Sequence, residues 1–546
     1  MTAKIPSVPC IELFGDIDEN FYQLGLRDRE SGKLVHSSVK SMLKTPFTPV
    51  NLLMEEVGKQ VIKNSFLKET HRYSHLRAYA DGMNIAAEEV FYSMLIPELV
   101  SAMTKWAPGI VAGNLGCSSF FTLNENKEMI HGRILDFPLQ GSFDEHERIV
   151  SYQLNGMPKT LGFGSSGIPY PSITCMTESG MTVALHQKFT NIFNTNGEFI
   201  FEIIFELIKN ANDKKSAIEF LKSKQSLTTW CLYMGFNNGD VLAYDLMGQD
   251  HFYNEYQIEE NKILYFSNHL ENIKLDQNDY LPLGFEKYNF MRDNSAQEKI
   301  KSYIVKSSKK NINCDIDLLK MMTSPKKDNL KTHYQMDCLT PSSITAVTMN
   351  PKAEKCHFIT GAAPKYYQNN IVCISDTFGS LEQQFCNDTK FKDNGVKEIH
   401  SGMHAIMKAQ HGFDDKDPQV IYHELQFAID HFENRSEKNI AHFYFLIAQY
   451  IYETHPKVLF HLLSEFKLLD NQLPDYLNDH CLLFIARLEY ILKLPPSLEE
   501  DRIHTLKLRE ILKLELKIPR TIFHFTNRLM IVPRVDILDV IYVYTY

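Results

Sequence analysis

A short segment around residue 117 contains the residue types that acyl-transfer chemistry needs. Cys117 follows Gly116 and begins an apolar run that reads as a strand, and Arg133 and Asp136 lie further along a second such run. Two antiparallel strands joined by a short loop would bring Arg133 and Asp136 back beside Cys117. A thiol is a weak nucleophile at neutral pH until a base or a nearby positive charge activates it. The pattern therefore predicts a cysteine nucleophile flanked by an arginine and a carboxylate.

Two downstream segments extend this pattern. Residues 263–267 are expected to form a strand, and Asn268 and His269 follow at its end. Residues 343–364 read as two short strands joined by a turn. Together with residues 114–137, they resemble the N-terminal-nucleophile (Ntn) hydrolases of the acyl-CoA:6-aminopenicillanate acyltransferase-like group, peptidase family C45. Acid ceramidase, N-acylethanolamine acid amidase and bile salt hydrolase are more distant relatives, and the resemblance covers about two thirds of the chain.

The resemblance implies a role for each of these residues. Members of that superfamily cut themselves immediately before the nucleophile, which places the cut between Gly116 and Cys117. The freed thiol would attack the substrate, and the new α-amine, with a pKa of ~7.7–8.0, would act as the base. Arg133 would orient a substrate carbonyl or carboxylate and lower the thiol pKa, and Asp136 would hold the α-ammonium group. Asn268 would donate a hydrogen bond to the oxyanion, and Gly116 would permit the strained backbone of an N-to-S acyl shift.

The chain departs from the family pattern at two positions. Relatives often have Asn after the strand that corresponds to residues 182–185, where this chain has His186. A histidine can donate one hydrogen bond but titrates near neutral pH, so His186 is a second candidate for the oxyanion. Relatives also often carry an arginine in the helix after the Asn-His strand. Lys287 lies nearby here, and a lysine lacks the rigid fork of an arginine.

The apolar spacing predicts the elements that must hold these residues in place. Residues 50–107 read as mainly helical, because apolar side chains recur every three or four positions. Residues 117–385 alternate many short strands with a helical pair at 197–223, a pattern typical of two sheets with helices outside them. The pattern predicts an α+β fold, and the resemblance implies the four-layer αββα core of the Ntn hydrolases.

Three segments follow from this organisation and from the implied cut. Residues 1–116 are an N-terminal helical segment, which would be the α-chain after self-cleavage. Residues 117–385 are the expected Ntn-hydrolase catalytic core, and residues 390–546 are a mainly helical C-terminal module outside the resemblance. Apolar and charged residues alternate over 506–518, so we expect this module to end in a β-ribbon.

Composition excludes several classes of protein. The 546 residues include 57 Lys and Arg against 67 Asp and Glu, a net charge of −10. Because there is also no long basic block, nucleic-acid binding is not expected. No window of about 18 residues is apolar throughout, and no signal peptide is recognisable. We therefore expect a cytoplasmic chain without an integral membrane segment.

No organic cofactor or metal is expected from the sequence. The ten cysteines are scattered without a C-x-x-C pair, which argues against a disulfide framework and a zinc cage. Residues 162–167 spell G-x-G-x-x-G, but Pro169 follows and prevents the helix that a dinucleotide site needs. His400, His404 and His411 have no recognisable further ligand.

The function expected from the resemblance is cleavage or transfer of the acyl group of a linear, non-peptide amide through a Cys117 thioester. The partner would be a small-molecule N-acyl amide or another acyl donor, and the two cut chains would stay associated. One alternative is an N-acyltransferase that uses acyl-CoA or an amide donor. Another is a catalytically retired scaffold whose C-terminal module binds a partner protein. A third is a thiol hydrolase that never cuts itself, with His186 or His269 as base; whether the chain forms a homo-oligomer is open.

Overall fold

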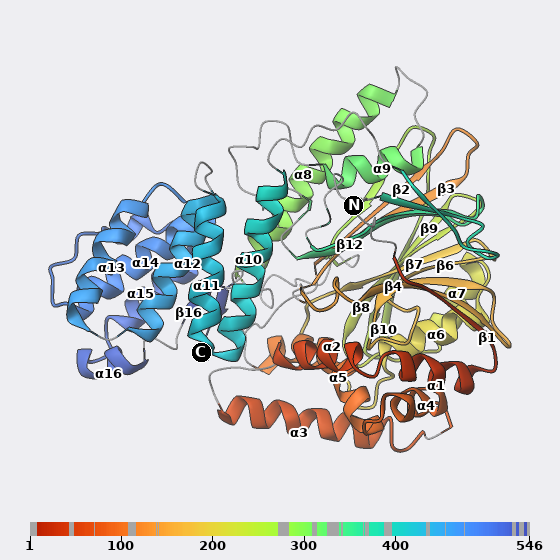
Figure 1. The fold of residues 1–546 in the computed structure, drawn as a ribbon, viewed down its shortest axis with the longest axis horizontal. Coiled ribbons are helices and arrows are strands. Elements are labelled where there is room, and N and C mark those ends of the chain that lie inside the picture. The colour runs from red at the N-terminus through yellow and green to blue at the C-terminus, as the bar shows by residue number, and fades with distance from the viewer. Residues whose placement is uncertain are drawn as a thin grey trace, which may run out of the picture.

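The chain folds as an α+β protein in which two β-sheets stack face to face with helices outside them (Figure 1). The computed structural model describes residues 8–42, 48–69, 71–106, 116–137, 139, 141–270, 283–307, 314–324, 338–339, 342–363, 365, 371–386, 396–432, 437–453, 455–473, 475–526, 531–533 and 540–542.

The first sheet has eight strands in the order β1-β4-β5-β6-β7-β8-β9-β10. Its pairs are antiparallel except that β1 runs parallel to β4. The G-x-G-x-x-G segment lies mostly in β5, so it is a strand of this sheet and opens no helix. The strands are β1 (Cys10–Gly15), β4 (Glu147–Leu154), β5 (Thr160–Ser165), β6 (Thr174–Thr177), β7 (Met181–Gln187), β8 (Thr229–Phe236), β9 (Asp240–Met247) and β10 (Asp250–Gln257).

The second sheet has seven antiparallel strands in the order β11-β2-β3-β12-β13-β14-β15. Most of its strands are buried along nearly their whole length, as expected for a sheet covered on both faces. The strands are β2 (Gly116–Leu123), β3 (Met129–Asp136), β11 (Leu264–Phe266), β12 (Ser343–Asn350), β13 (Lys355–Ile359), β14 (Ile371–Ser375) and β15 (Glu382–Phe385).

Apolar side chains from both sheets meet between them, and helices close the two outer faces. Phe163 of the first sheet stacks on Phe358 of the second at a ring-centroid distance of 5.9 Å. Helix α6 (Ile200–Asn210) packs on the other face of the first sheet, and α7 (Lys214–Lys222) lies beside it. Helix α9 (Cys314–Thr323) packs on the outer face of the second sheet, beside α8 (Leu283–Ser307). The expected four-layer αββα core is confirmed.

The N-terminal helices lie against the outer face of the first sheet. Helices α1 and α4 cross very closely, because Gly25 and Gly82 let the backbones touch. A Cβ atom on Gly25 would lie 2.1 Å from the carbonyl oxygen of Tyr79, which no side chain could tolerate. These helices are α1 (Ile17–Arg27), α2 (Ser31–Ser41), α3 (Thr48–Asn64), α4 (Ser74–Met83) and α5 (Ala87–Trp106).

The C-terminal helices form a separate group beside the two sheets (Figure 1). No helix among the described residues has the length and apolar character that crossing a membrane requires. The elements are α10 (Val396–Asp415), α11 (Pro418–His431), α12 (Glu437–Tyr452), α13 (Pro456–Leu469), α14 (Asp475–Ile491), a 3-10 turn (Glu500–Arg502), α15 (Leu506–Glu515), α16 (Arg520–Thr526), β16 (Ile531–Pro533) and β17 (Val540–Tyr542).

The β-ribbon expected over residues 506–518 is wrong. That segment forms helix α15, whose buried residues Leu508, Ile511 and Leu512 recur at helical spacing. A buried ion pair then joins Arg487 of α14 to Glu515, with N–O distances of 2.8 and 2.5 Å. The spacing of the leucines fits the period of a strand as well as that of a helix, and packing against α14 favours the helix. A short ribbon, β16 with β17, follows it in the chain.

Candidate active site

The hairpin of β2 and β3 places Arg133 beside Cys117. Gly116 pairs with Asp136 and Cys117 with Leu135 across the two strands. Arg133 Nη2 donates to Cys117 Sγ at 2.9 Å and to the carbonyl oxygen of Leu185 at 2.7 Å. The scissile position implied by the resemblance therefore lies directly opposite a carboxylate, and the thiol lies against a guanidinium.

The turn between these strands explains why their register is well defined. Asn124 Oδ1 accepts hydrogen bonds from the backbone N–H groups of Asn126 and Glu128, at 3.0 and 2.9 Å. Lys127 takes the left-handed conformation, with φ of 60°, that such a tight loop needs. Because a slip of one residue would turn every side chain to the opposite face, this local polar turn determines that Arg133 faces the thiol.

The environment of the thiol has opposing effects on its ionisation. Burial raises the pKa of Cys117, and the neighbouring charge and hydrogen bond of Arg133 act in the opposite direction. Cys117 is 1% exposed and Arg133 is fully buried. In the intact chain the thiol therefore stays mainly protonated at neutral pH, and a base is needed to form the thiolate.

Asn268 follows β11 and holds the backbone nitrogen of Cys117. Its Oδ1 accepts a hydrogen bond from Cys117 N at 2.8 Å and a second from Arg292 Nη2 at 2.6 Å. Two donors on one side of the amide require the oxygen there, and Nδ2 accordingly donates to the carbonyl of Gln187 at 2.9 Å. The oxygen of Asn268, and not its nitrogen, faces Cys117 in the intact chain; its oxyanion role stays a prediction.

Arg292 is a site residue that the sequence reasoning missed. It lies in α8, is fully buried, and donates through Nη1 to Asp136 Oδ2 at 3.0 Å. The other oxygen of Asp136 accepts from Ser343 Oγ at 2.5 Å. The resemblance pointed instead to Lys287, whose side chain lies outside the described residues. Asn289 and Arg292 are three residues apart, so they lie on the same face of α8, and both are buried. This helical spacing of two polar residues is the signal in the sequence that could have identified Arg292.

His186 lies in the site, but its hydrogen bonds differ from those expected. Nδ1 is 3.0 Å from the carbonyl oxygen of Ser267, so that nitrogen carries the proton and donates. Nε2 lies 2.9 Å from Arg133 Nη1 and 2.8 Å from Ser119 Oγ, and it accepts. Burial, followed by the charges of Arg133 and Lys188, holds the pKa of His186 well below its usual value. This neutral ring orients Arg133 and has no donor directed at the thiol.

A buried lysine and an exposed histidine complete the surroundings. Lys188 is fully buried and donates to Tyr233 Oη at 2.9 Å and to the carbonyl of Ser267 at 3.1 Å, which supports the segment before Asn268. His269, the alternative base, is instead paired with Asp293 at 2.5 Å, and its side chain is 56% exposed. Because His269 is exposed and already paired with Asp293, it is poorly placed to act as the base for the buried thiol.

An apolar cavity lies next to the nucleophile. Leu135, the cross-strand partner of Cys117, and Leu185, whose carbonyl accepts from Arg133, both line it. Its other walls come from the N-terminal helices, α6 and β8. The lining has almost no polar surface, and the free space is about 30 Å³, so only a small apolar group would fit without movement of the lining side chains. The lining residues are His36, Val39, Ser93, Met94, Pro97, Leu135, Phe137, Ile168, Ile173, Leu185, Phe201 and Trp230.

Comparisons with known proteins identify similar solved structures only. No family model matches the chain, and no curated protein matches its sequence. An N-acylethanolamine-hydrolyzing acid amidase ortholog from Caenorhabditis elegans is 15% identical with a TM-score of 0.31, and the match covers 46% of this chain and 98% of that one. Penicillin V acylase from Agrobacterium tumefaciens is 11% identical with a TM-score of 0.32, over 48% and 88%. A variant of the conjugated bile acid hydrolase from Clostridium perfringens is 11% identical with a TM-score of 0.29, over 51% and 99%.

Proposed function

We propose that this chain is a self-processing cysteine hydrolase of the Ntn type, which cuts linear amides that carry an apolar acyl group. The observation that carries the proposal is that both reactive atoms of Cys117 are held by buried polar side chains. Arg133 donates to the sulfur, and Asn268 Oδ1 accepts from the nitrogen. Any buried backbone N–H needs an acceptor, but here that acceptor is the side chain of a distant asparagine, and a guanidinium faces the sulfur. A residue whose sulfur and nitrogen both take part in the reaction would need side chains at both atoms.

Self-cleavage would begin with attack of Cys117 Sγ on the carbonyl carbon of Gly116. The C–N bond breaks, a thioester forms, and the proton lost by the thiol ends on the nitrogen of Cys117. Water then hydrolyses the thioester, which leaves a carboxylate on Gly116 and a free α-amine and thiol on Cys117. Asp136, directly opposite Gly116 in the register, lies where it can stabilise the new ammonium group.

The same groups would then act on substrate. The α-amine takes the thiol proton, and the thiolate attacks the acyl carbon of the amide. The ammonium returns the proton to the leaving amine, and water releases the acyl group from the thioester. Asn268 Oδ1 keeps the α-amine in position, and the buried Asp136–Arg292 pair holds Asn268 in turn.

The apolar cavity supplies the reason for an apolar acyl group. Leu135 and Leu185, which neighbour the nucleophile, line it together with Trp230. Burial of an alkyl chain there would contribute about 0.8 kcal/mol per methylene. The free space is about 30 Å³, little more than one water, so we expect kcat/KM to rise over the first one or two methylenes and then to level off, because a longer chain would have to displace the lining side chains. Val39→Phe, which narrows the cavity, should penalise long chains more than acetyl substrates.

The proposal is tested by denaturing electrophoresis and intact mass on the wild type and on Cys117→Ala. Wild type should give a small chain of about 13 kDa, in proportion to 116 of the 546 residues of the 63.2 kDa chain, and a large chain that begins at Cys117. Cys117→Ala should remain one chain. Cys481→Ala, which changes another buried cysteine in α14, is the matched control and should still cut. A single uncut wild-type chain would contradict the mechanism.

The acceptor of the acyl group needs a second measurement. With an N-acyl amide alone, mass spectrometry should show the free acid, which identifies water as the acceptor. With a second amine added in excess, appearance of the exchanged amide would instead support the acyltransferase alternative. Cys117→Ala should form neither product.

A further inference from the structure

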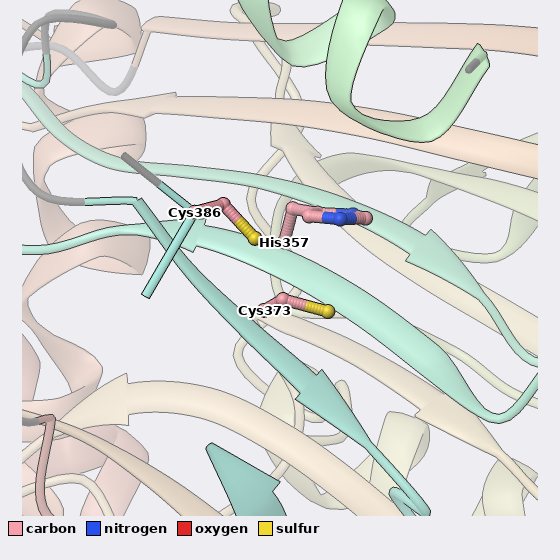
Figure 2. Close-up of side chains that lie close together, drawn as sticks. All are labelled: His357, Cys373 and Cys386. Carbon is pink, nitrogen blue, oxygen red and sulfur yellow. The ribbon is translucent and has the colours of Figure 1, made fainter. Parts of the chain in front are cut away.

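One histidine and two cysteines gather at the edge of the seven-stranded sheet that lies opposite β11 (Figure 2). His357 of β13 pairs directly with Cys373 of β14. Cys386 follows β15, two residues after Gln384, which is the partner of Cys373 on that strand. One ligand atom from each of the three residues lies within 4.8 Å of the other two.

The cluster faces away from the core between the two sheets. Cys356 and Phe358 flank His357 in the chain, and both pack in the apolar cluster between the sheets. Because successive side chains of a strand point to opposite faces, His357 and Cys373 point to the outer face, where α9 packs. The three side chains therefore belong neither to the inter-sheet core nor to the polar network of Cys117.

His357 has an unmet hydrogen-bonding capacity. It is 2% exposed, and its Nδ1 is buried without a hydrogen-bond partner in the described part of the chain. Buried polar atoms in folded proteins almost always have a partner, so such an atom calls for an explanation. An imidazole nitrogen beside two thiols is a good metal ligand set, and a bound cation would satisfy it.

We propose that His357, Cys373 and Cys386 bind one Zn²⁺ ion. Tetrahedral zinc with sulfur and nitrogen ligands places the ligand atoms ~3.5–3.8 Å apart. The three ligand atoms lie within 4.8 Å of one another, which exceeds the tetrahedral spacing by at most ~1 Å. Rotation of the two cysteine side chains can close this gap. Thiolate and imidazole ligands favour zinc over magnesium or calcium, which prefer oxygen. Cys386 is partly exposed, so water can reach the fourth position from its side.

The charge balance favours this ion. Zn²⁺ replaces the protons of two thiols, which are released to solvent, so the metal and its two thiolates carry no net charge together. Lys355 lies on the same face as His357, two residues away, and its positive charge acts on His357 and Cys373, which favours the thiolate form of Cys373 but opposes a cation. Asp315 of α9 interacts with Lys355 and offsets part of that charge. Binding therefore adds no net charge to a largely buried place, and it avoids the main cost of burying an ion.

Bound zinc would stabilise the fold, because its three ligands come from neighbouring strands at an open sheet edge and from the residue just beyond the last of them. β15 is the last strand of this sheet, and Cys386 lies just beyond it. A metal bonded there would tie the end of the catalytic core to β13 and β14. Metal binding to the folded chain but not to the unfolded chain adds to stability.

The test measures zinc in the full-length protein. Reduced wild type is incubated with zinc sulfate, dialysed, and analysed for metal by inductively coupled plasma mass spectrometry. We expect ~1 zinc per chain in wild type and below ~0.2 in His357→Gln, Cys373→Ser and Cys386→Ser. Cys10→Ser, which changes a partly exposed cysteine outside the cluster, is the matched control and should keep the metal.

Two further readouts keep the test decisive if the buried Cys373 variant fails to fold. Cys386→Ser alters a partly exposed side chain, and its circular dichroism should match wild type. Cobalt-loaded wild type should show thiolate-to-cobalt charge-transfer absorption that Cys386→Ser weakens. Equal metal content in wild type and Cys386→Ser would overturn the proposal. So would a Cys373–Cys386 disulfide in the intact mass together with no zinc uptake after reduction.

Discussion

The two cysteine-containing clusters of the seven-stranded sheet differ in how their side chains are held. Around Cys117, each side chain is held by at least one hydrogen bond, and Asn268 and Asp136 each bind Arg292, although Arg133 Nε is also buried without a partner among the described residues. At the opposite edge, His357 is as buried as these residues, yet its Nδ1 has no hydrogen-bond partner within the described ranges. The first arrangement suits the proposed reaction, whereas the second would be completed by the ion that we propose.

The largest expected effect comes from breaking the buried ion pair of the first cluster. In a Cys117→Ala background, which keeps the chain uncut, Arg292→Met should lower the stability by ~3–5 kcal/mol, because it leaves the Asp136 carboxylate buried without its partner. Thermal unfolding followed by circular dichroism measures this. Adding Asp136→Asn should restore part of the loss. Equal melting temperatures for Arg292→Met with and without Asp136→Asn would show that the two groups are not coupled.

A matched pair of histidine variants compares the two clusters directly. His186→Leu should cost ~1–3 kcal/mol, because it leaves the side chains of Arg133 and Ser119 without their acceptor. His357→Leu, measured with a chelator present, should change stability by less than about 0.5 kcal/mol, because it removes a group that has an unpaired nitrogen. Chemical unfolding in the Cys117→Ala background gives both values. If both variants lose a similar free energy of unfolding, the two clusters do not differ in how their histidines are held.

A smaller effect is expected on the pH dependence of self-cleavage. Arg133 lowers the pKa of the Cys117 thiol, so Arg133→Gln should raise that pKa and reduce the thiolate fraction at every pH below it. If the thiol pKa rises by about one, the rate of cutting should fall about tenfold, and its rising limb should move to higher pH. Electrophoresis of freshly made protein between about pH 5 and 9 follows the reaction. Arg133→Lys keeps the charge and should move the limb less, whereas an unchanged profile in Arg133→Gln would exclude this electrostatic role.

The local sequence accounts for much of the geometry around Cys117. The short polar turn at residues 124–128 and the apolar runs on either side set the β2–β3 register, which places Arg133 and Asp136 near Cys117. Most strands and helices expected between residues 117 and 385 are present, because periodic apolar patterns reflect burial directly. The prediction of a β-ribbon at residues 506–518 was wrong because the leucine spacing fits a strand as well as a helix. Only the contact with α14 favours the helix.

Tertiary structure alone decided the remaining features. Arg292 reaches Asp136 across 156 residues of chain, and no local rule distinguishes it from other helical arginines. The neutral state of His186 and the orientation of Asn268 depend on donors that converge from separate strands. His357, Cys373 and Cys386 lack the close spacing of zinc motifs and meet only through the pairing of β13, β14 and β15. Sequence determines which residues share a hairpin, whereas long-range sheet pairing determines which distant side chains meet.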